Sequence, residues 1–440
     1  MEDVLGNPVS GGAAASLAAI DDFVEGFLGY EKRAANVVAA ATADPGSVLA
    51  NIYAGFSWMF LEAAEAYGHA AAYLERAEAA SAGANARERL LLEQLRQWIA
   101  GDIPAVQALG AQIVDAFPRD LASVKLHQYF SFNRGDAPAM LAIAEAALPA
   151  SPNDAHLQGM LAFGYEQMHR LEEAEAAARR ALELKLKEPW AQHALAHVML
   201  STGRVREGER FLAEASRTWV DLNSFMYTHN WWHKALFSIS LGDEQAVFDA
   251  YDGHVWGIEP TYSQDQVGAV SLLARMEIAG MDVGNRWSEV ADYLKARGKD
   301  TLQPFLTIQY LYGLARAERA EADTLMAAVE DRARDARFFD QPVWAEVALP
   351  ACRGVLAHAR SRHAEAARLL DQVAPRIQEI GGSHAQRDLF GQLRLDAHRK
   401  AGHWAIARQL LEMRRIWDPD GVPFNRMLAD AEGHLATAAE

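Results

Sequence analysis

The chain has 440 residues, half of them hydrophobic, and a formal net charge of −17 at pH 7. This charge argues against nucleic acid and anionic membranes as partners, because their phosphates would be repelled. The single cysteine, Cys352, excludes an internal disulfide and fits a reducing compartment. No apolar run reaches membrane-spanning length and the chain opens with the acidic stretch Met1-Glu2-Asp3, so we expect a soluble, cytoplasmic protein.

The sequence of the N-terminal part predicts helices that do not recur at a fixed interval. Residues 1–16 are small and loop-like, and the stretch from Leu17 to Ala43 carries helical spacing. Two further helices are expected, one starting at Ser47 and one running from Tyr67 to Ala80. We therefore expect an N-terminal helical cap over residues 1–84.

From residue 85 onward the sequence repeats at a fixed interval. Equivalent turn positions recur in steps of 34 residues (135 − 101, 169 − 135 and 203 − 169), at Gly101, Gly135, His169 and Gly203. A helix–turn–helix unit of this length is the period of the tetratricopeptide repeat. The same step of 34 links small or apolar residues where the second helix of each unit would pack on the first, namely Ile113, Ala147, Ala181 and Ala215.

The array then becomes irregular. The next turn comes at Gly242, which is 39 residues after Gly203 (242 − 203), so an insert is expected near residues 218–223. Two longer loops are predicted at residues 253–262 and 338–342, where Gly and Pro interrupt the helical spacing.

No segment alternates apolar and polar residues as a β-strand would. We therefore predict an all-α protein, a tetratricopeptide-type α-solenoid in which helical hairpins form a right-handed superhelix. Its regular repeats would span residues 85–252. Residues 253–440 would form irregular and C-terminal hairpins of the same superhelix.

The resemblance to the tetratricopeptide repeat implies which side chains face the concave surface. With the turn residue as position 15, they come from about positions 2, 5, 9 and 12. In the unit ending at Gly203 this register gives His193 and His197, and Trp190 precedes them in the same helix. The corresponding side chains of the unit before are His156, Gly159, Phe163 and Glu166.

A second histidine pair follows in the string His229-Asn230-Trp231-Trp232-His233. The histidines of each pair stand four residues apart, so on a helix both rings leave the same face. His229 and Trp232 would face inward, and His233 would lie beside them. Imidazole and indole rings would thus gather on one surface, where a peptide groove more usually carries Lys, Arg and Asn.

Three interpretations of these histidines stay open. A neutral imidazole, whose ordinary pKa of about 6.5 lies near the operating pH, could act as a general base at His193, His197 or His229. The pairs could hold a metal, but Ala194 replaces the glutamate of zincin helices and no carboxylate or cysteine completes the site, so we predict no metal and no cofactor. The rings could also simply fill the interior.

The string from Gly381 to Asp388 is the second candidate. Two glycines would end one helix, Ser383 would cap the next, and Gln386 would complete a capping box. His384, Arg387 and Asp388 remain in the first helical turn, where they could bind a ligand that carries an anionic group. A structural clamp between Arg387 and Asp388 is the alternative.

Five strings resemble the tetratricopeptide repeat protein thirty-eight family, in order along the chain from about Asp44 to the last hairpin. The specific ones are the His229–His233 string and the Gly381–Asp388 string. The others are Trp190 to His197, the run from Gly242 that ends in Tyr251-Asp252, and Gly284-Asn285-Arg286-Trp287. The resemblance implies a fold and a set of marked positions, but no reaction. Members of the family carry a string similar to Ala-His-x-x-Glu-Met at the position of Ala196-His197. In this chain Leu200 stands at the glutamate position, so the predicted groove wall lacks that carboxylate.

Two functions are compatible with these patterns. The first is a protein that binds a small, partly apolar ligand in a His/Trp-lined concave pocket, with hydrolase or lyase activity by histidine acid–base chemistry as one version. The alternative is a non-catalytic scaffold that takes a peptide or partner helix in its concave groove. Whether the protein is an enzyme and whether it forms a homo-oligomer stay open.

Overall fold

The computed structural model describes residues 1–438, and within them it contains helices and turns but no named strand. The extended pairings in this range are two isolated bridges, Glu2 with Pro8 and Glu31 with Leu222. The predicted all-α class is therefore confirmed. The last two residues of the predicted region 253–440 lie outside the described part of the chain. Among the described helices, none is both long and apolar enough to cross a membrane.

The chain divides into two compact units. Unit 1 comprises residues 1–132, 136–195 and 218–226, and unit 2 comprises residues 133–135, 196–217 and 227–440. The division expected from the sequence, after residues 84 and 252, rests on how regularly the sequence repeats, not on which residues pack together. That division therefore stays a prediction.

The helices of unit 1 are α1 (Ala14–Leu28), α2 (Asn36–Ala43), α3 (Val48–Met59), α4 (Ala64–Ala80), α5 (Ala86–Ala100), α6 (Ile103–Ala116), α7 (Leu121–Asn133), α8 (Ala137–Ala147), α9 (Ala155–Gln167) and α10 (Leu171–Leu184). Helices α11 (Pro189–Ser201) and α13 (Ser224–Leu241) contribute residues to both units, and the last residue of α7, Asn133, belongs to unit 2. Unit 2 contains α12 (Val205–Ala215), α14 (Glu244–Ala250), α15 (Ser263–Ala279), α16 (Arg286–Leu294), α17 (Pro304–Arg316), α18 (Glu321–Arg334), α19 (Gln341–Val343), α20 (Leu349–Ala359), α21 (His363–Val373), α22 (His384–Lys400), α23 (Trp404–Arg414) and α24 (Val422–Thr437).

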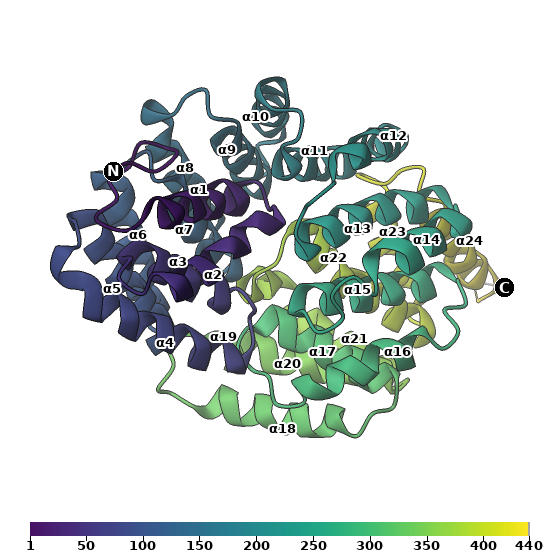
Figure 1. Ribbon diagram of the computed structural model, residues 1–440. Coiled ribbons are helices and arrows are strands. Elements are labelled where there is room, and N and C mark those ends of the chain that lie inside the picture. Colours follow the sequence, from purple (N-terminus) through teal and green to yellow (C-terminus); the bar gives the residue numbers. More distant parts are fainter. Residues whose placement is uncertain (439–440) are drawn as a thin grey trace. The chain divides into compact units, whose positions relative to one another are not determined.

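The turns of the repeat fall where the 34-residue step places them. Gly101, Gly135 and Gly203 have φ angles of 80°, 66° and 70°, a left-handed conformation that glycine adopts without steric cost. His169 takes the same conformation at φ 55° although it carries a Cβ. The helices on either side of Gly101 and of His169 pair up, α5 with α6 and α9 with α10, and α20 pairs with α21 in the same way further along the chain (Figure 1). The tetratricopeptide-type hairpin architecture is thus confirmed.

Side-chain caps explain where several repeat helices begin. Asp102, Asp136 and Asp154 each accept the backbone N–H of the residue three positions later, which satisfies one of the free donors of the first turn. Asn85 forms a full capping box with Glu88 at the start of α5. Acidic caps also suit the positive end of the helix dipole.

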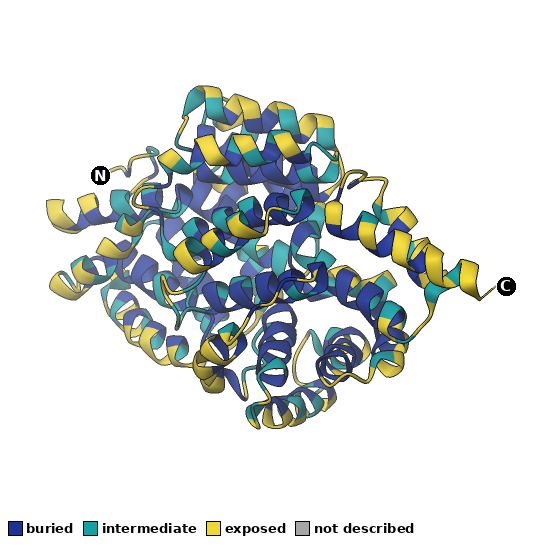
Figure 2. Ribbon diagram, turned by 90° about the vertical axis from the view of Figure 1, so that its right-hand side faces the viewer, coloured by how far each residue is buried: buried dark blue, intermediate teal, exposed yellow. Residues whose placement is uncertain are grey.

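The outer helices present a buried side and an exposed side, as expected for stacked hairpins (Figure 2). Helix α17 lies further inside, and all of its residues except Arg316 are buried. The side chains of Ile113, Ala147 and Ala181, which the 34-residue step relates to one another, are fully buried. In unit 2 one continuous core contains Trp232, Trp344 and many aliphatic side chains. Small residues at the helix contacts let neighbouring helices approach closely.

The prediction of one continuous helical stretch from Leu17 to Ala43 is wrong, because the structure has two α-helices there with a break between them. Helix α1 ends at Leu28, Tyr30 is left-handed at φ 55°, and α2 starts at Asn36. A Cβ at Gly26 would lie 2.5 Å from the backbone nitrogen of Ala34, so the returning chain packs directly on this glycine. The break depends on close packing that helical spacing cannot reveal.

The predicted insert at residues 218–223 belongs to unit 1 and pairs with the break after α1. The backbone N–H of Asn223 donates to the carbonyl of Tyr30 at 2.6 Å, and the N–H of Lys32 donates to the carbonyl of Asp221 at 3.0 Å. Near the other two predicted loops the chain makes single π-helical turns, Tyr251–Val255 and Trp344–Ala348. Such turns insert an extra residue into a helix.

Candidate functional site

In unit 1, α9 and α11 bring three predicted site residues into contact. The rings of Trp190 and His193 are stacked with centroids 4.4 Å apart, and the ring of Phe163 lies 4.5 Å from Trp190 and 5.1 Å from His193. Phe163 and His193 are buried. The repeat register thus correctly predicts that these rings share one surface.

A chain of polar contacts borders these rings. Lys185 donates from Nζ to Nε2 of His156 at 3.2 Å, and Nδ1 of His156 lies 3.0 Å from Oε1 of Glu188. Because an ammonium group only donates, Nε2 accepts and the imidazole proton sits on Nδ1, which donates to Glu188. The second oxygen of Glu188 accepts the backbone N–H of Ala191 in the first turn of α11. Glu166, also predicted as a site residue, is buried and accepts from the side chain of Gln167.

Lys125 is a residue of this region that sequence reasoning missed. Its ammonium donates to the carbonyls of Phe27 and Leu28 at the end of α1, and Nζ lies 3.2 Å from the centre of the Tyr30 ring. Burial lowers the pKa of Lys125 well below its usual range, and the charge of Glu188 opposes this shift. The signal was present, since Lys125 stands ten residues before Gly135, as His193 stands ten before Gly203.

The end of α1 covers the concave positions of these repeats. A Cβ at Gly29 would lie 3.5 Å from Cε1 of His156, and the ring of Tyr30 lies 5.2 Å from the ring of Trp190. Lys125 ties the same turn to α7. In unit 1 the predicted groove residues His156 and Trp190 therefore pack against the turn that follows α1.

A small aromatic hollow lies next to this contact. It measures about 10 Å³, which is room for about one water molecule. Phe27, Tyr53 and Leu126 are among its lining residues, and none of the predicted site residues is.

In unit 2 the remaining predicted histidines form a second ring cluster, which joins the end of α11 to α13. The ring of His233 lies 4.5 Å from that of His197 and 4.8 Å from that of His229. Trp232 stacks on His229 at 5.3 Å with an interplanar angle of 10°. All four side chains are buried.

The environment sets the protonation of His229. Burial, aided by the nearby charge of His197, lowers the pKa of His229 to about 3. The ring is thus neutral and a weak base at physiological pH, which suits a packed or ligating imidazole better than a general base.

The string from Gly381 to Asp388 opens α22 as expected. Ser383 and Gln386 form the predicted capping box. The predicted alternative, a clamp between Arg387 and Asp388, is wrong because these two side chains bind different partners. Asp388 instead accepts from both Nη atoms of Arg414, at 2.7 and 2.8 Å, whereas Arg387 donates to the carbonyl of Gly382. Although burial works to raise the pKa of Asp388, Arg414 lowers it to about 2.

Arg275 in α15 is the second residue that sequence reasoning missed. It is buried, and its guanidinium donates to the carbonyl of Ala385 at 2.7 Å. A lone arginine in an apolar helix carries no signal of this contact, because the two residues are 110 positions apart.

Gly381→Ala should destabilise unit 2 by about 3 kcal/mol. Gly381 has φ 86°, and a Cβ there would lie 2.6 Å from the carbonyl oxygen of Asn133. Gly391→Ala is the matched control, because its Cβ would meet nothing closer than 3.7 Å and alanine favours the helix. Urea denaturation followed by circular dichroism should separate the two variants; equal midpoints would show that the loop adapts without cost.

No protein-family model matches the chain. Among solved structures, the crystal structure of the yeast Tom70 is similar at 13% sequence identity over 97% of this chain and 89% of that chain, with a TM-score of 0.36. A structure of Naa15/Naa10 bound to HypK-THB is similar at 12% identity over 96% of this chain and 67% of that chain, with a TM-score of 0.26. At TM-scores this low, neither similarity carries an argument about function, and the resemblance to the thirty-eight family stays a prediction.

Proposed function

We propose that the protein is a helical-repeat scaffold that binds a protein partner through an exposed apolar face of its last hairpin. The observation that carries this proposal is the exposure of large hydrophobic side chains on α23 and the turn after it. Ile406 is 41% exposed, Met413 50% and Ile416 80%. Contiguous apolar surface of this kind is typical of interaction sites.

The spacing of these side chains places them on one side of a helix. Ile406, Leu410, Met413 and Trp417 follow at intervals of four, three and four residues, and Ile416 lies beside them. The helical turn continues past Arg414, whose carbonyl accepts the backbone N–H of Trp417 at 3.2 Å. These five hydrophobic residues are called the α23 face.

Of the α23 face, Leu410 is partly buried and packs against the core of unit 2. Ala407 and Leu411, on the adjacent side of α23, are fully buried and hold the helix to unit 2. The other residues of the α23 face, Ile406, Met413, Ile416 and Trp417, are exposed and therefore add apolar surface beyond what packing within the hairpin requires.

The partner we propose is an amphipathic helix with a net positive charge. An apolar stripe along one helix fits a second helix with apolar residues at the same spacing. Residues 404–422 contain three arginines and three acidic residues, so they are locally neutral, but the whole chain carries −17. This field attracts a basic partner and opposes a second copy of the chain.

The concave groove is a weaker place for the partner. In unit 1 the positions that the repeat register assigns to it are packed against the end of α1, through contacts of Tyr30 with Trp190 and of Lys125 with the carbonyls of Phe27 and Leu28. A partner there would first have to displace a helix that buries Phe23 and Val24.

A photo-crosslinking amino acid at position 416 tests the proposal. Expressed in the native host, this variant should capture one protein whose crosslinked segment is a basic amphipathic helix. The same group at Leu186, which is 71% exposed in unit 1, is the matched control and should not capture it. Identical products from both positions, or a crosslinked segment without that character, would contradict the proposal.

A second candidate function is the binding of a small ligand at the buried imidazoles, with hydrolysis or elimination as its catalytic version. It is supported by the contacts among His197, His229 and His233 in unit 2. Turnover of a library substrate that is lost in His197→Ala, with an unchanged melting temperature, would favour this candidate. Loss of stability alone would assign the rings to the core.

A further inference from the structure

The buried guanidinium of Arg275 lacks an opposite charge in contact with it. Asp388 is the acidic group whose charge acts on it, but both carboxylate oxygens of Asp388 are bound by Arg414, and Gln392 donates to one of them at 2.8 Å. Among the described residues, no carboxylate lies within ion-pair distance of Arg275. A buried charge without such compensation is costly.

Hydrogen bonds satisfy most of this guanidinium but not all of it. One Nη donates to the carbonyl of Ser271 at 3.2 Å and to its hydroxyl, and the other donates to the carbonyl of Ala385 at 2.7 Å. Within the described chain, Nε of Arg275 has no acceptor although it is buried. A buried donor without an acceptor points to a group that the protein alone does not provide.

A second unsatisfied donor belongs to Trp232, whose ring contacts the guanidinium of Arg275. The Trp232 ring centre lies 5.2 Å from the guanidinium carbon of Arg275, and the indole Nε1–H is also buried without an acceptor in the part of the chain described. Both side chains are at most 1% exposed. An indole N–H and an arginine Nε–H can only donate, so the missing group must accept.

The first turn of α22 adds positive potential at the same place. Nη of Arg275 reaches the carbonyl of Ala385, one residue after the start of that helix. The N-terminus of a helix carries a partial positive charge and favours anions. A guanidinium next to a helix N-terminus favours an anion in contact with it, and the nearby carboxylate of Asp388 is already bound by Arg414.

We propose that a small carboxylate ligand binds in unit 2 between α13, α15 and α22, where it accepts hydrogen bonds from Nε of Arg275 and Nε1 of Trp232. The ligand neutralises the guanidinium and satisfies both donors. This site is independent of the α23 face. In this proposal Arg275 binds the anionic group of the ligand. The sequence alone suggests Arg387 or His384 for that role.

Sodium acetate is the probe, titrated calorimetrically into the full chain after exhaustive dialysis into carboxylate-free buffer, with sodium chloride at the same ionic strength as reference. Acetate should bind saturably. Trp232→Phe keeps the ring over the guanidinium and removes only the N–H, so it should raise the dissociation constant about tenfold. Arg275→Lys keeps the charge and loses the Nε donor, and it should weaken binding at least as much.

Arg316→Lys is the matched control, because that guanidinium is paired with Glu277 at 2.6 Å, and it should leave acetate binding unchanged. Native mass spectrometry of the dialysed protein identifies any ligand that remains bound, and a retained organic acid supports the proposal. Equal acetate affinity in wild type and Trp232→Phe would overturn it. So would equal binding of chloride, or a retained ligand without a carboxylate.

Discussion

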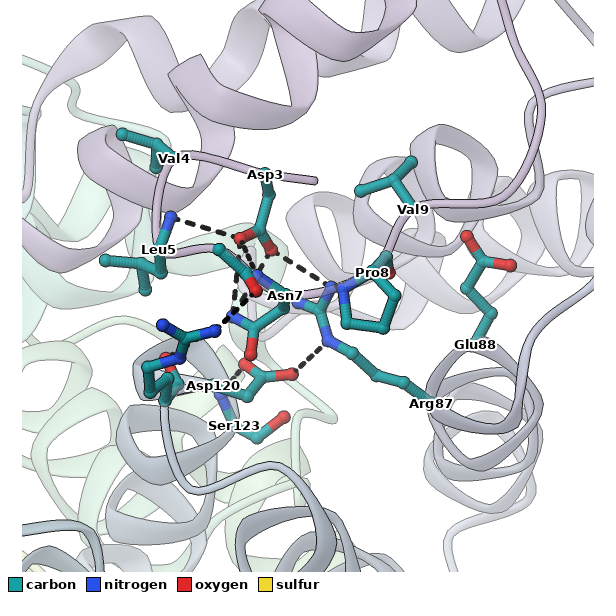
Figure 3. A network of polar contacts seen from close by, with 12 residues as sticks. Asp3, Val4, Leu5, Asn7, Pro8, Val9, Arg87, Glu88, Asp120 and Ser123 are labelled. Atoms are coloured by element: carbon teal, nitrogen blue, oxygen red, sulfur yellow. Dashed lines mark hydrogen bonds and ion pairs between the residues drawn. The ribbon is translucent and has the colours of Figure 1, made fainter. Parts of the chain in front are cut away.

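Arg87→Met should lower the free energy of unfolding by about 3–5 kcal/mol. The Arg87 side chain is fully buried, with Nη1 3.0 Å from Asp3 and Nε 2.7 Å from Asp120 (Figure 3). It also donates to the Tyr53 hydroxyl at 2.9 Å. Methionine would leave two buried carboxylates without a cation. Urea denaturation of the full chain measures the loss.

Arg96→Met is the matched control for this loss. Its ion pair with Glu78 is about two-fifths exposed on both sides, so it should cost less than about 1 kcal/mol. The variant with Arg87→Met, Asp3→Asn and Asp120→Asn together should regain much of the loss, because it leaves no buried charge unpaired. A loss as small as that of Arg96→Met would show that the network does not hold the N-terminal segment.

Acidification should destabilise the wild-type protein through His229 alone by several kcal/mol. The pKa of this buried ring is about 3 in the folded protein and about 6.5 in an unfolded chain, so the unfolded state binds more protons between these values. The stability contributed by the neutral ring is present above pH 6.5 and is lost as the pH falls towards 3. Each pH unit in that window costs about 1.4 kcal/mol.

His229→Gln isolates this effect. At pH 8 the ring is neutral in both states, so the difference between variant and wild type there reports packing alone. Below pH 6.5 the free energy of unfolding of the variant should fall less steeply with pH, by the equivalent of one proton. Parallel pH profiles would mean that His229 is accessible to protons in the folded protein.

The periodic part of the fold could be predicted because its cause is local. A left-handed residue every 34 positions ends one helix and starts the next, and Gly101, Gly135 and Gly203 do so by their own backbone preference. The capping box of Ser383 and Gln386 is likewise contained within four residues. Such features depend only on residues that are close together in the sequence, so the sequence alone predicts them.

The contacts that shape the candidate site depend on distant parts of the chain. Lys125 meets the carbonyl of Leu28 across 97 residues, and Arg275 meets Ala385 across 110. The ion pair of Asp3 with Arg87 is of the same kind, since the sequence predicts only that residues 1–16 are small and loop-like. A single sequence predicts which rings share a helix face, but it does not reveal what covers that face.

The most direct test of the proposed function is a binding titration with the purified segment that crosslinks at position 416. Wild type, Met413→Asp and Leu186→Asp are compared by fluorescence anisotropy at low and high salt. We expect Met413→Asp to weaken binding at least tenfold, Leu186→Asp to bind like wild type, and high salt to weaken all three. Equal affinity of Met413→Asp and wild type would contradict a partner on the α23 face.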